Sequence, residues 1–300
     1  MVLAVLTAQV IVPAAVCAWI CFPRSRHLLP WWLTVLLAFS TTMFFYVAGR
    51  WDILGYPLRY ALPVGFLAAA TTSWIRRETA PSVPRSALVV QVVCYALMAL
   101  PLLWLLVNAL LERRAPGNAV ELSFPLREGR FYVSHGGSGP LLNQHHDVHA
   151  QRYALDINQL NAWGRSINAL TDGEPRDYPI FGRPVHSPCR GTVVTTENDL
   201  PDLTPPDRDP QRPAGNHVVV ECLGVKVLMA HLRQGSVRVR PGDDVGEGDV
   251  LAEVGNSGNT SRPHLHLEAV RNAQQPDLDD GDPAPMTFGG EALVRNDVRK

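Results

Sequence analysis

The chain has 300 residues with 27 basic and 28 acidic side chains, and its formal net charge of −1 argues against a strongly basic nucleic-acid binder. This average conceals two unlike parts. Up to Arg114 there are nine arginines and three acidic residues, whereas the remainder has 18 basic and 25 acidic residues. Because about 300 residues usually form two domains, we predict an apolar region at 1–114, a polar domain at 115–275 and a tail at 276–300.

The apolar region has the composition of a membrane protein. A helix of about 20 apolar residues crosses a hydrocarbon core of roughly 30 Å, and the first segment contains no charged side chain. A cleaved signal peptide is the alternative for that segment, but it has no basic start and no small-residue cleavage pattern. The third segment is short, and it reaches full length only if it tilts or if Arg59 extends to the interface. We predict a four-helix transmembrane region with spans at residues 2–22, 31–48, 60–75 and 87–111.

The arginines between the predicted spans indicate the orientation. Four spans leave both ends of the region on one side. The loops on the other side hold five arginines, against four on the side of the C-terminal domain. The positive-inside rule then places that domain outside the cytoplasm, with the chain in the cytoplasmic (inner) membrane and the lipid bilayer as a partner. A transporter or sensor would need polar residues inside the spans, where Arg59 is the only clear one.

The polar part has the pattern of a mainly β domain. Proline and glycine recur every few residues from about residue 115, and no long stretch keeps the apolar spacing of a helix. Residues 198–215 are rich in proline and aspartate, which predicts a long loop of the kind that is often functional. We expect the tail to be solvated and to have little order. The predicted strands are residues 152–158, 191–196, 217–222 and 225–231.

Residues 239–255 repeat valine, proline, glycine and aspartate, and the glycines permit tight turns between very short strands. This segment resembles the hammerhead hairpin of biotinyl-type β sandwiches. Such carriers bear their cofactor on a lysine at the tip, and this segment contains no lysine. We therefore interpret it as scaffold.

The histidines are the first indication of chemistry, because nine of the ten lie at or after position 135. The strand period of two would send His264 and His266 to one face. His231 ends an apolar strand, and Asp156 ends an alternating one beside a local run of histidines. Two neutral imidazoles and one carboxylate are a common ligand set of catalytic Zn²⁺, which acidifies a bound water. More histidines are present than three ligand positions require, which favours catalysis over a closed structural site.

Three motifs resemble those of the M23 peptidases, the lysostaphin and LytM-type zinc endopeptidases that cut peptidoglycan cross-bridges. They are Tyr-Ala-Leu-Asp-Ile at 153–157, Ala-His-Leu at 230–232, and Gly-Asn-Ser-Gly-Asn-Thr-Ser through His-Leu-His at 255–266. The resemblance covers roughly residues 134–270. It implies a small antiparallel β domain with zinc in an open groove.

The resemblance also implies a role for each matching residue. Asp156 and His266 correspond to zinc ligands. His231 and His264 correspond to the unligated pair that activates water and stabilises the tetrahedral intermediate. Of the two, our own hypothesis takes His264 as the general base and His231 as the residue that stabilises the oxyanion.

The first zinc ligand departs from the common family pattern. That pattern has a histidine four residues before the aspartate, where this chain has Arg152. A branch of similar proteins has Asn-x-His upstream of Gln-Arg-Tyr-Ala-Leu-Asp, which selects His145 as the ligand. His146 and His149 stay open as alternatives.

We therefore expect a membrane-anchored zinc metalloendopeptidase that hydrolyses peptide bonds of cell-wall peptidoglycan. The alternative is a catalytically inactive LytM-like domain that binds and regulates another cell-wall hydrolase or an envelope complex. Such domains typically lack one or more ligands, whereas this chain has a full set of candidates. Outside the cytoplasm, Cys189 and Cys222 could also form a disulfide, because they lie near the ends of two strands expected to be close.

Overall fold

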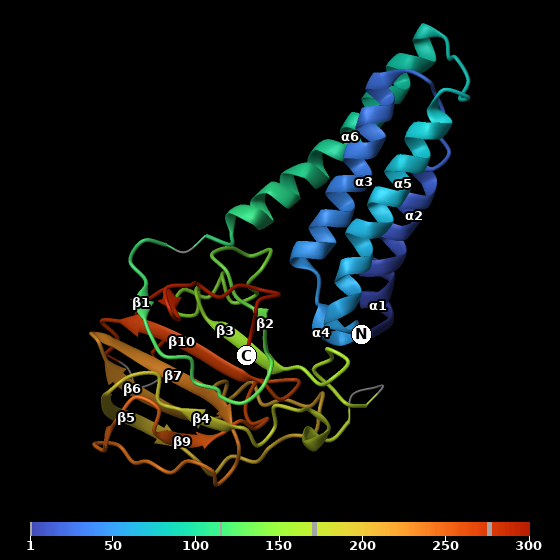
Figure 1. Ribbon diagram of the computed structural model, residues 1–300. Coiled ribbons are helices and arrows are strands. Elements are labelled where there is room, and N and C mark those ends of the chain that lie inside the picture. Colours follow the sequence, from blue (N-terminus) through green and yellow to red (C-terminus); the bar gives the residue numbers. More distant parts are fainter. Residues whose placement is uncertain (1, 115, 170–172, 275–277) are drawn as a thin grey trace. The chain divides into compact units, whose positions relative to one another are not determined.

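The computed structural model describes residues 2–114, 116–169, 173–274 and 278–300 (Figure 1). The chain divides into two compact units, Met1–Leu111 and Glu112–Lys300. This division falls close to the change of composition at Arg114. The predicted boundaries at 115 and 275 themselves lie outside the described residues.

The first unit is helical, as its apolar composition predicts. Its long helix α3 contacts α5 through the Trp31 indole, which donates a hydrogen bond to Ser73 Oγ at 3.0 Å. Its elements are α1 (Val2–Leu6), the π-helical η1 (Thr7–Ile11), α2 (Val12–Ile20), α3 (Leu28–Ala48), α4 (Trp51–Leu54), the 3₁₀ helix η2 (Tyr56–Tyr60), α5 (Ala61–Arg77) and α6 (Arg85–Leu111).

Within the described residues, two helices are long and apolar enough to cross a membrane by length and composition. They are Leu28–Ala48, with a mean hydropathy of 1.6, and Arg85–Leu111, with 2.2. The structure thus has two candidate spans where the sequence predicts four. Helix α5 has 17 residues, or about 26 Å at 1.5 Å per residue, and its last turn carries two arginines. The first predicted span is divided by a π-helical segment, and its apolar part runs over Ala4–Ile20.

The second unit contains a nine-stranded sheet, counted over its described residues, in which neighbouring strands are antiparallel. This confirms the mainly antiparallel β prediction. The strand order is β13-β2-β3-β10-β7-β6-β5-β8, with β11 paired to β10 (Figure 1). The strands are β2 (Phe131–His135), β3 (Leu155–Gln159), β5 (Gly191–Glu197), β6 (Asn216–Cys222), β7 (Val225–Leu232), β8 (Asp244–Val245), β10 (Leu265–Arg271), β11 (Asp282–Pro283) and β13 (Val298–Arg299).

Four of these strands coincide with the predicted ones, although β3 begins three residues later than expected. Residues 198–215 contain no strand, as predicted. In the hammerhead-like segment the strands are very short: β8 extends the main sheet, and β9 (Val250–Glu253) pairs with β4 (Pro184–His186).

The central strand β10 is buried on both faces. Leu265, Leu267 and Ala269 alternate into the main apolar core, together with residues of β3 and β7. The opposite face carries His266, Glu268 and then Val270, which belongs to a second, smaller apolar cluster. Because alternate residues point to opposite faces, one strand both supports the core and presents polar groups.

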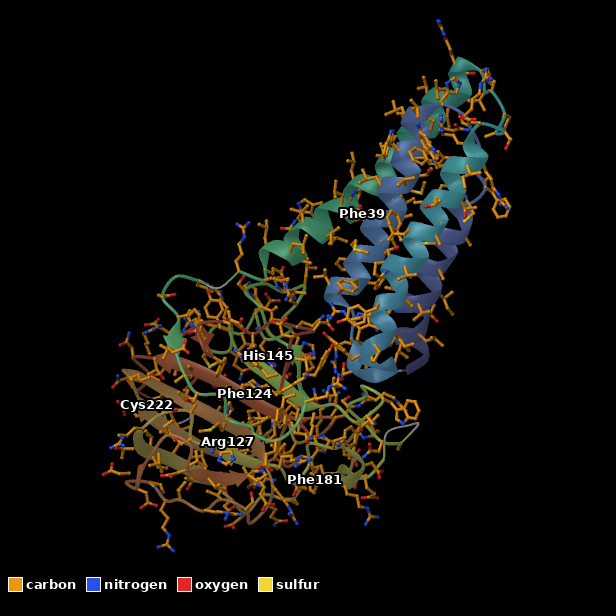
Figure 2. All side chains as sticks on the ribbon, in the orientation of Figure 1. Phe39, Phe124, Arg127, His145, Phe181 and Cys222 are labelled. Carbon is orange, nitrogen blue, oxygen red and sulfur yellow. A yellow bond between two sulfur atoms is a disulfide. The ribbon has the colours of Figure 1, made fainter. Side chains whose placement is uncertain are left out.

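The tail is not a solvated end, contrary to the expectation. Strand β12 (Met286–Thr287) pairs in parallel with β1 (Val120–Glu121), and β13 pairs with β2. Phe124, labelled in Figure 2, packs against Phe288 at 5.7 Å between ring centroids. Strand pairing and the burial of apolar side chains together order this polar segment, because that burial removes apolar surface from water.

Cys189 and Cys222 form a disulfide, with a Cα–Cα distance of 6.3 Å. The bond joins the turn before β5 to the end of β6. The pairing that the sequence left open is therefore present, and both cysteines belong to the main apolar core.

Candidate metal centre

The candidate site begins with a row of residues across the sheet. Asp156 on β3 is the register partner of His266 on β10, and His266 is also the partner of Ala230 on β7. Directly paired residues of antiparallel strands point to the same face. Asp156 and His266 are 3% and 4% exposed, so the pairing brings a carboxylate and an imidazole together away from water.

His145 reaches this row from a turn and not from a strand. Asn143 is fully buried, and its amide nitrogen donates to the carbonyls of Arg152 and Ala154, both at 3.1 Å. Its amide oxygen accepts the backbone N–H of His145 at 3.1 Å. The asparagine of the Asn-x-His pattern thus fixes the conformation of the turn that carries His145.

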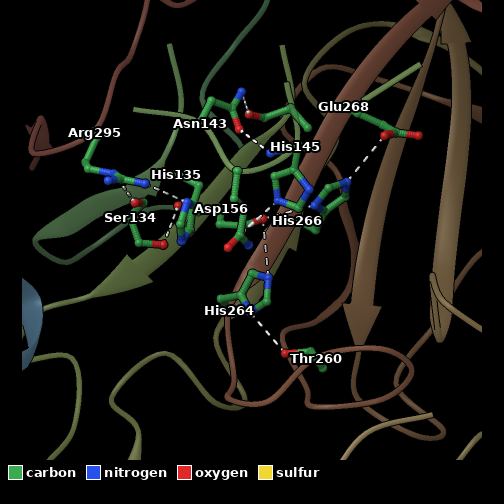
Figure 3. Close-up of polar contacts among 12 residues, drawn as sticks. Ser134, His135, Asn143, His145, Asp156, Thr260, His264, His266, Glu268 and Arg295 are labelled. Carbon is green, nitrogen blue, oxygen red and sulfur yellow. Dashed lines mark hydrogen bonds and ion pairs between the residues drawn. The ribbon is translucent and has the colours of Figure 1, made fainter. Parts of the chain in front are cut away.

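His145, Asp156 and His266 each offer a ligand atom, and these atoms lie within 4.8 Å of one another (Figure 3). His145 Nε2 lies 3.0 Å from Asp156 Oδ2, and His266 Nδ1 lies 3.0 Å from Asp156 Oδ1. Neither His146 nor His149 belongs to a possible metal-binding group among the described residues. The structure therefore brings together the three residues expected to hold the metal.

A second group shares one of these residues. His231, His264 and His266 also offer ligand atoms within 4.8 Å of one another. The rings of His231 and His264 are 4.8 Å apart between centroids, and His264 Nε2 lies 3.4 Å from Asp156 Oδ1. The expected acid–base pair thus faces the expected ligands.

Backbone carbonyls set the proton positions on this pair. A carbonyl oxygen can only accept, so His264 Nδ1 donates to the carbonyl of Arg262 at 2.8 Å. His231 Nδ1 donates in the same way to the carbonyl of Ser257 at 2.9 Å. When the two rings are neutral, each therefore has its lone pair on Nε2.

His231 has an unusual backbone conformation. In a regular strand it would point to the face opposite that of its neighbour Ala230, and so away from His266. Its φ of 60° lies in the left-handed region, and its N–H donates to the carbonyl of Ala214 at 3.0 Å. L residues rarely adopt this region, and such strain is concentrated at functional sites. The alternation is broken at the residue that has to turn toward the cluster.

Three side chains of the cluster titrate far from their usual range, and two of them are Asp156 and His231. Burial alone would raise the pKa of Asp156, but the His145 and His264 imidazoles outweigh it and hold the pKa well below its usual value. Burial, together with the neighbouring His264 and His266, holds the pKa of His231 well below its usual value. At neutral pH the site therefore contains an ionised carboxylate and a neutral His231.

Glu268 is the residue that the sequence analysis missed. It is 2% exposed, and its Oε2 lies 3.3 Å from His266 Nε2. Burial alone would lower the pKa of His266, but the hydrogen bonds to Asp156 and Glu268 outweigh it and raise the pKa to about 10. Metal-binding histidines commonly use their second nitrogen in this way. The signal was available, because Glu268 follows His266 by two residues on the same face.

The glycine-rich motif supports the site by a close approach of two loops. Gly258 has a φ of +84°, and a Cβ there would collide with the backbone of Gly215 at the end of the long loop. A Cβ on Gly215 would in turn collide with Ser257. The contact holds Ser257 in the position where its carbonyl accepts a hydrogen bond from His231. The glycine-rich motif therefore supports the site through the shape of its backbone.

Two other histidines of this domain serve contacts elsewhere. His186 and His217 hydrogen-bond through Nδ1 to the carbonyls of Gly248 and Gly215. His135 is the exception, because it is the register partner of Asp156 and its ring lies 6.1 Å from that of His145. The sequence assigned it no role.

The donor set fits Zn²⁺. Imidazole nitrogen and carboxylate oxygen are its usual ligands apart from thiolates, and a three-ligand set leaves a position for water. No cysteine belongs to either group among the described residues. The two groups share His266, so a single ion held by the first would face both imidazoles of the second.

Residues 177–278 match the family model described as "Peptidase family M23". The matched range contains His231, His264, His266 and Glu268, whereas His145 and Asp156 precede it. This part of the chain is therefore similar to the M23 peptidases. Comparison with curated proteins found no match.

Several solved structures are similar to this chain. A variant catalytic domain of the prophage-encoded M23 protein EnpA from Enterococcus faecalis is 17% identical, over 56% of this chain and 95% of that one, with a TM-score of 0.34. The deep-sea M23 metalloprotease pseudoalterin is 14% identical, over 60% and 98%, with a TM-score of 0.35. The catalytic domain of lysostaphin from Staphylococcus simulans is 16% identical, over 52% and 89%, with a TM-score of 0.31.

Proposed function

We propose that this chain is a membrane-anchored zinc metalloendopeptidase that hydrolyses peptide bonds of cell-wall peptidoglycan. The observation that carries the proposal is the buried Asp156 carboxylate between His145 and His266, with two further imidazoles facing it. The M23 family match supports the reaction class.

In this proposal His145, Asp156 and His266 hold Zn²⁺, and Glu268 orients the His266 ring. When bound, the ion would lower the pKa of a water molecule and polarise the scissile carbonyl. His264 is proposed to accept the proton from that water at Nε2, since its Nδ1–H is committed to the Arg262 carbonyl. His231 has its Nδ1–H committed to the Ser257 carbonyl, so it would donate to an oxyanion only from Nε2 and only after that atom has taken up a proton. The proton that leaves the water would be its source.

The placement of the two units is part of the same proposal. We propose that the helical unit is embedded in the cytoplasmic membrane in several spans and that the β domain lies outside the cytoplasm. The two candidate spanning helices support the first statement. The Cys189–Cys222 disulfide supports the second, because disulfides persist in oxidising compartments.

Zinc analysis of the purified full-length protein, combined with incubation on purified cell wall, tests the activity. The wild type should contain zinc and release peptide fragments. His264→Ala should keep the zinc and lose hydrolysis by about 10²–10⁴-fold, the usual contribution of a positioned acid or base. His266→Ala should lose both. A zinc-loaded wild type that leaves the wall intact would instead favour an inactive domain that regulates another hydrolase.

A further inference from the structure

The segment between β2 and Asn143, residues 136–142, has the sequence Gly-Gly-Ser-Gly-Pro-Leu-Leu, and we refer to it as the glycine loop. Two of its three glycines, Gly137 and Gly139, lie against Glu112. A Cβ on Gly139 would collide with the Glu112 side chain, and one on Gly137 would lie 3.2 Å from the Glu112 carbonyl oxygen. The absence of side chains at these positions therefore permits one particular contact.

Glu112 binds the glycine loop at both ends. Its carbonyl oxygen accepts the backbone N–H of Ser138 at 2.8 Å and the Ser138 hydroxyl at 3.1 Å. Its Oε2 accepts the backbone N–H of Leu142 at 2.9 Å. Leu142 is fully buried and immediately precedes Asn143, whose amide orients His145. Glu112 thus fixes the backbone from which the proposed ligand extends.

Arg295 holds the same region from the C-terminal segment. Its guanidinium donates to the Ser134 carbonyl at 3.0 Å, to the Leu141 carbonyl at 3.2 Å and to His135 Nδ1 at 2.9 Å (Figure 3). Arginine can only donate, so His135 Nδ1 accepts, which fixes the orientation of that ring. The His135 ring packs edge-on against His145, with an interplanar angle of 78°.

The two elements that carry these residues are also joined to each other. Arg113 Nη1 donates to the Arg295 carbonyl at 3.2 Å, and its Nη2 pairs with Asp297 at 2.7 Å. Glu112 and Arg113 directly follow helix α6, which ends at Leu111. Glu112 and Arg113 therefore contact the segments that surround His145.

We propose that Glu112 and Arg295 are positioning residues for His145, Glu112 through the glycine loop and Arg295 through His135. Both lie outside the residues that match the family model. This inference rests on the proposed function, because it takes His145 as a ligand of Zn²⁺. According to this inference, the affinity for Zn²⁺ depends on the chain segment that directly follows α6.

The first test measures Zn²⁺ affinity of the full chain in detergent by competition with a chelating dye. Glu112→Ala should bind Zn²⁺ about tenfold more weakly, at the lower end of the effect of removing supporting groups around a metal. Glu112→Gln should stay near the wild type, since its amide oxygen can still accept from Leu142. The matched control is Glu121→Ala: Glu121 also accepts backbone N–H groups of a glycine turn, at Gly289 and Gly290. That control should leave the affinity unchanged.

The second test uses Arg295→Lys, which keeps the charge but cannot reach three acceptors together. Arg299→Lys, in the same terminal segment, is its control. Arg295→Lys should weaken Zn²⁺ binding and alter the visible absorption spectrum of bound Co²⁺, which reports ligand geometry. Both measurements are made where circular dichroism shows each variant folded, so a purely structural role would not change the spectrum.

The outcomes separate the two hypotheses. Equal affinities for Glu112→Ala and Glu121→Ala, with equal Co²⁺ spectra for the two lysine variants, would overturn the positioning role while the proposed function stands. A wild type that binds no Zn²⁺, or binds it as well after His145→Ala, would overturn the assignment of His145 and this inference with it.

Discussion

At the scale of single residues, His266 has the most constrained chemistry in the site. Its two nitrogens face two buried carboxylates, Asp156 and Glu268, and its pKa is raised to about 10. Without a metal, the ring is therefore an imidazolium at neutral pH. The protonated ring supplies a positive charge close to the position proposed for the metal, which explains how two carboxylates can be buried here.

Zinc binding should therefore release a proton from His266. A metal ligand must be neutral imidazole, and the ring is charged at any pH below about 10. The apparent affinity for Zn²⁺ should therefore rise as the pH rises and fall as the pH falls. Calorimetry of Zn²⁺ binding at pH 7, in buffers of different ionisation enthalpy, measures the protons released. Heats that do not depend on the buffer would contradict a protonated His266.

Glu268→Gln is the matched variant for that measurement. It keeps the size of the side chain and removes one of the two charges that raise the pKa of His266. The pH above which zinc binding releases no proton from His266 should therefore fall below about 10, and the same calorimetry repeated at higher pH measures this shift.

At the scale of elements, the site depends on where strands and loops meet. Strand β10 places His266 and Glu268 beside Asp156, and the contact between Gly215 and Gly258 holds the loop that supports His231. These loops approach so closely that a single methyl group cannot be inserted without moving the backbone.

Gly258→Ala should destabilise the domain more than Gly224→Ala, in which the new methyl group meets no other atom and only the backbone conformation is unfavourable. An alanine with positive φ costs about 1–2 kcal/mol, and Gly224, with a φ of +75° and no atom within 4 Å of a Cβ, isolates that cost. Gly258→Ala should lose at least about 1 kcal/mol more, because its Cβ meets the backbone of Gly215. Urea unfolding of the two variants measures the difference. Equal losses would show that the loops move apart freely.

At the scale of the whole molecule, the disulfide connects fold and compartment. It closes a sequence separation of 33 residues, and a loop of this length corresponds to about 3–4 kcal/mol of stabilisation in the chain-entropy description. The free energy of unfolding of the β domain should fall by this amount in Cys189→Ala/Cys222→Ala. Denaturation followed by near-ultraviolet circular dichroism, with and without reductant, checks it: reductant should not affect the double variant.

The number of reactive thiols should report the location of the β domain. Cys17, Cys21 and Cys94 are free, and the chain has five cysteines. Protein extracted from cells under denaturing, non-reducing conditions should therefore react with maleimide–polyethylene glycol at three thiols, and at five after reduction. Five thiols without reduction would place the domain in a reducing compartment.

Local patterns predicted much of the second unit. The alternation of β10, the four strand ranges and the proline-rich loop depend on neighbours in sequence, and all of them are present. The choice of His145 over His146 and His149 also came from a short motif, and Asn143 shows why the spacing matters. Glu268 was missed although it continues the same alternation.

Other features depend on partners distant in the sequence. The segment that leads into the tail is acidic and contains proline, which predicted little order, whereas the partners that order the tail lie far away in the sequence, among them Phe124 and strands β1, β2 and β10. The four predicted spans rested on composition, which does not show where a helix begins and ends. Glu112 and Arg295 have no motif around them, because what they contact is a glycine loop and a histidine elsewhere in the chain.

By itself, the sequence determined the helical or β character of each unit, four strands of the main sheet and the residue types able to hold a metal, because periodicity and short motifs act within a few residues. Only the tertiary structure decided which of these side chains meet, how His231 turns into the cluster and which residues orient His145. Those properties arise from strand pairing and loop contacts across more than a hundred residues, such as that of Asp156 with His266. Such contacts leave no local pattern to read.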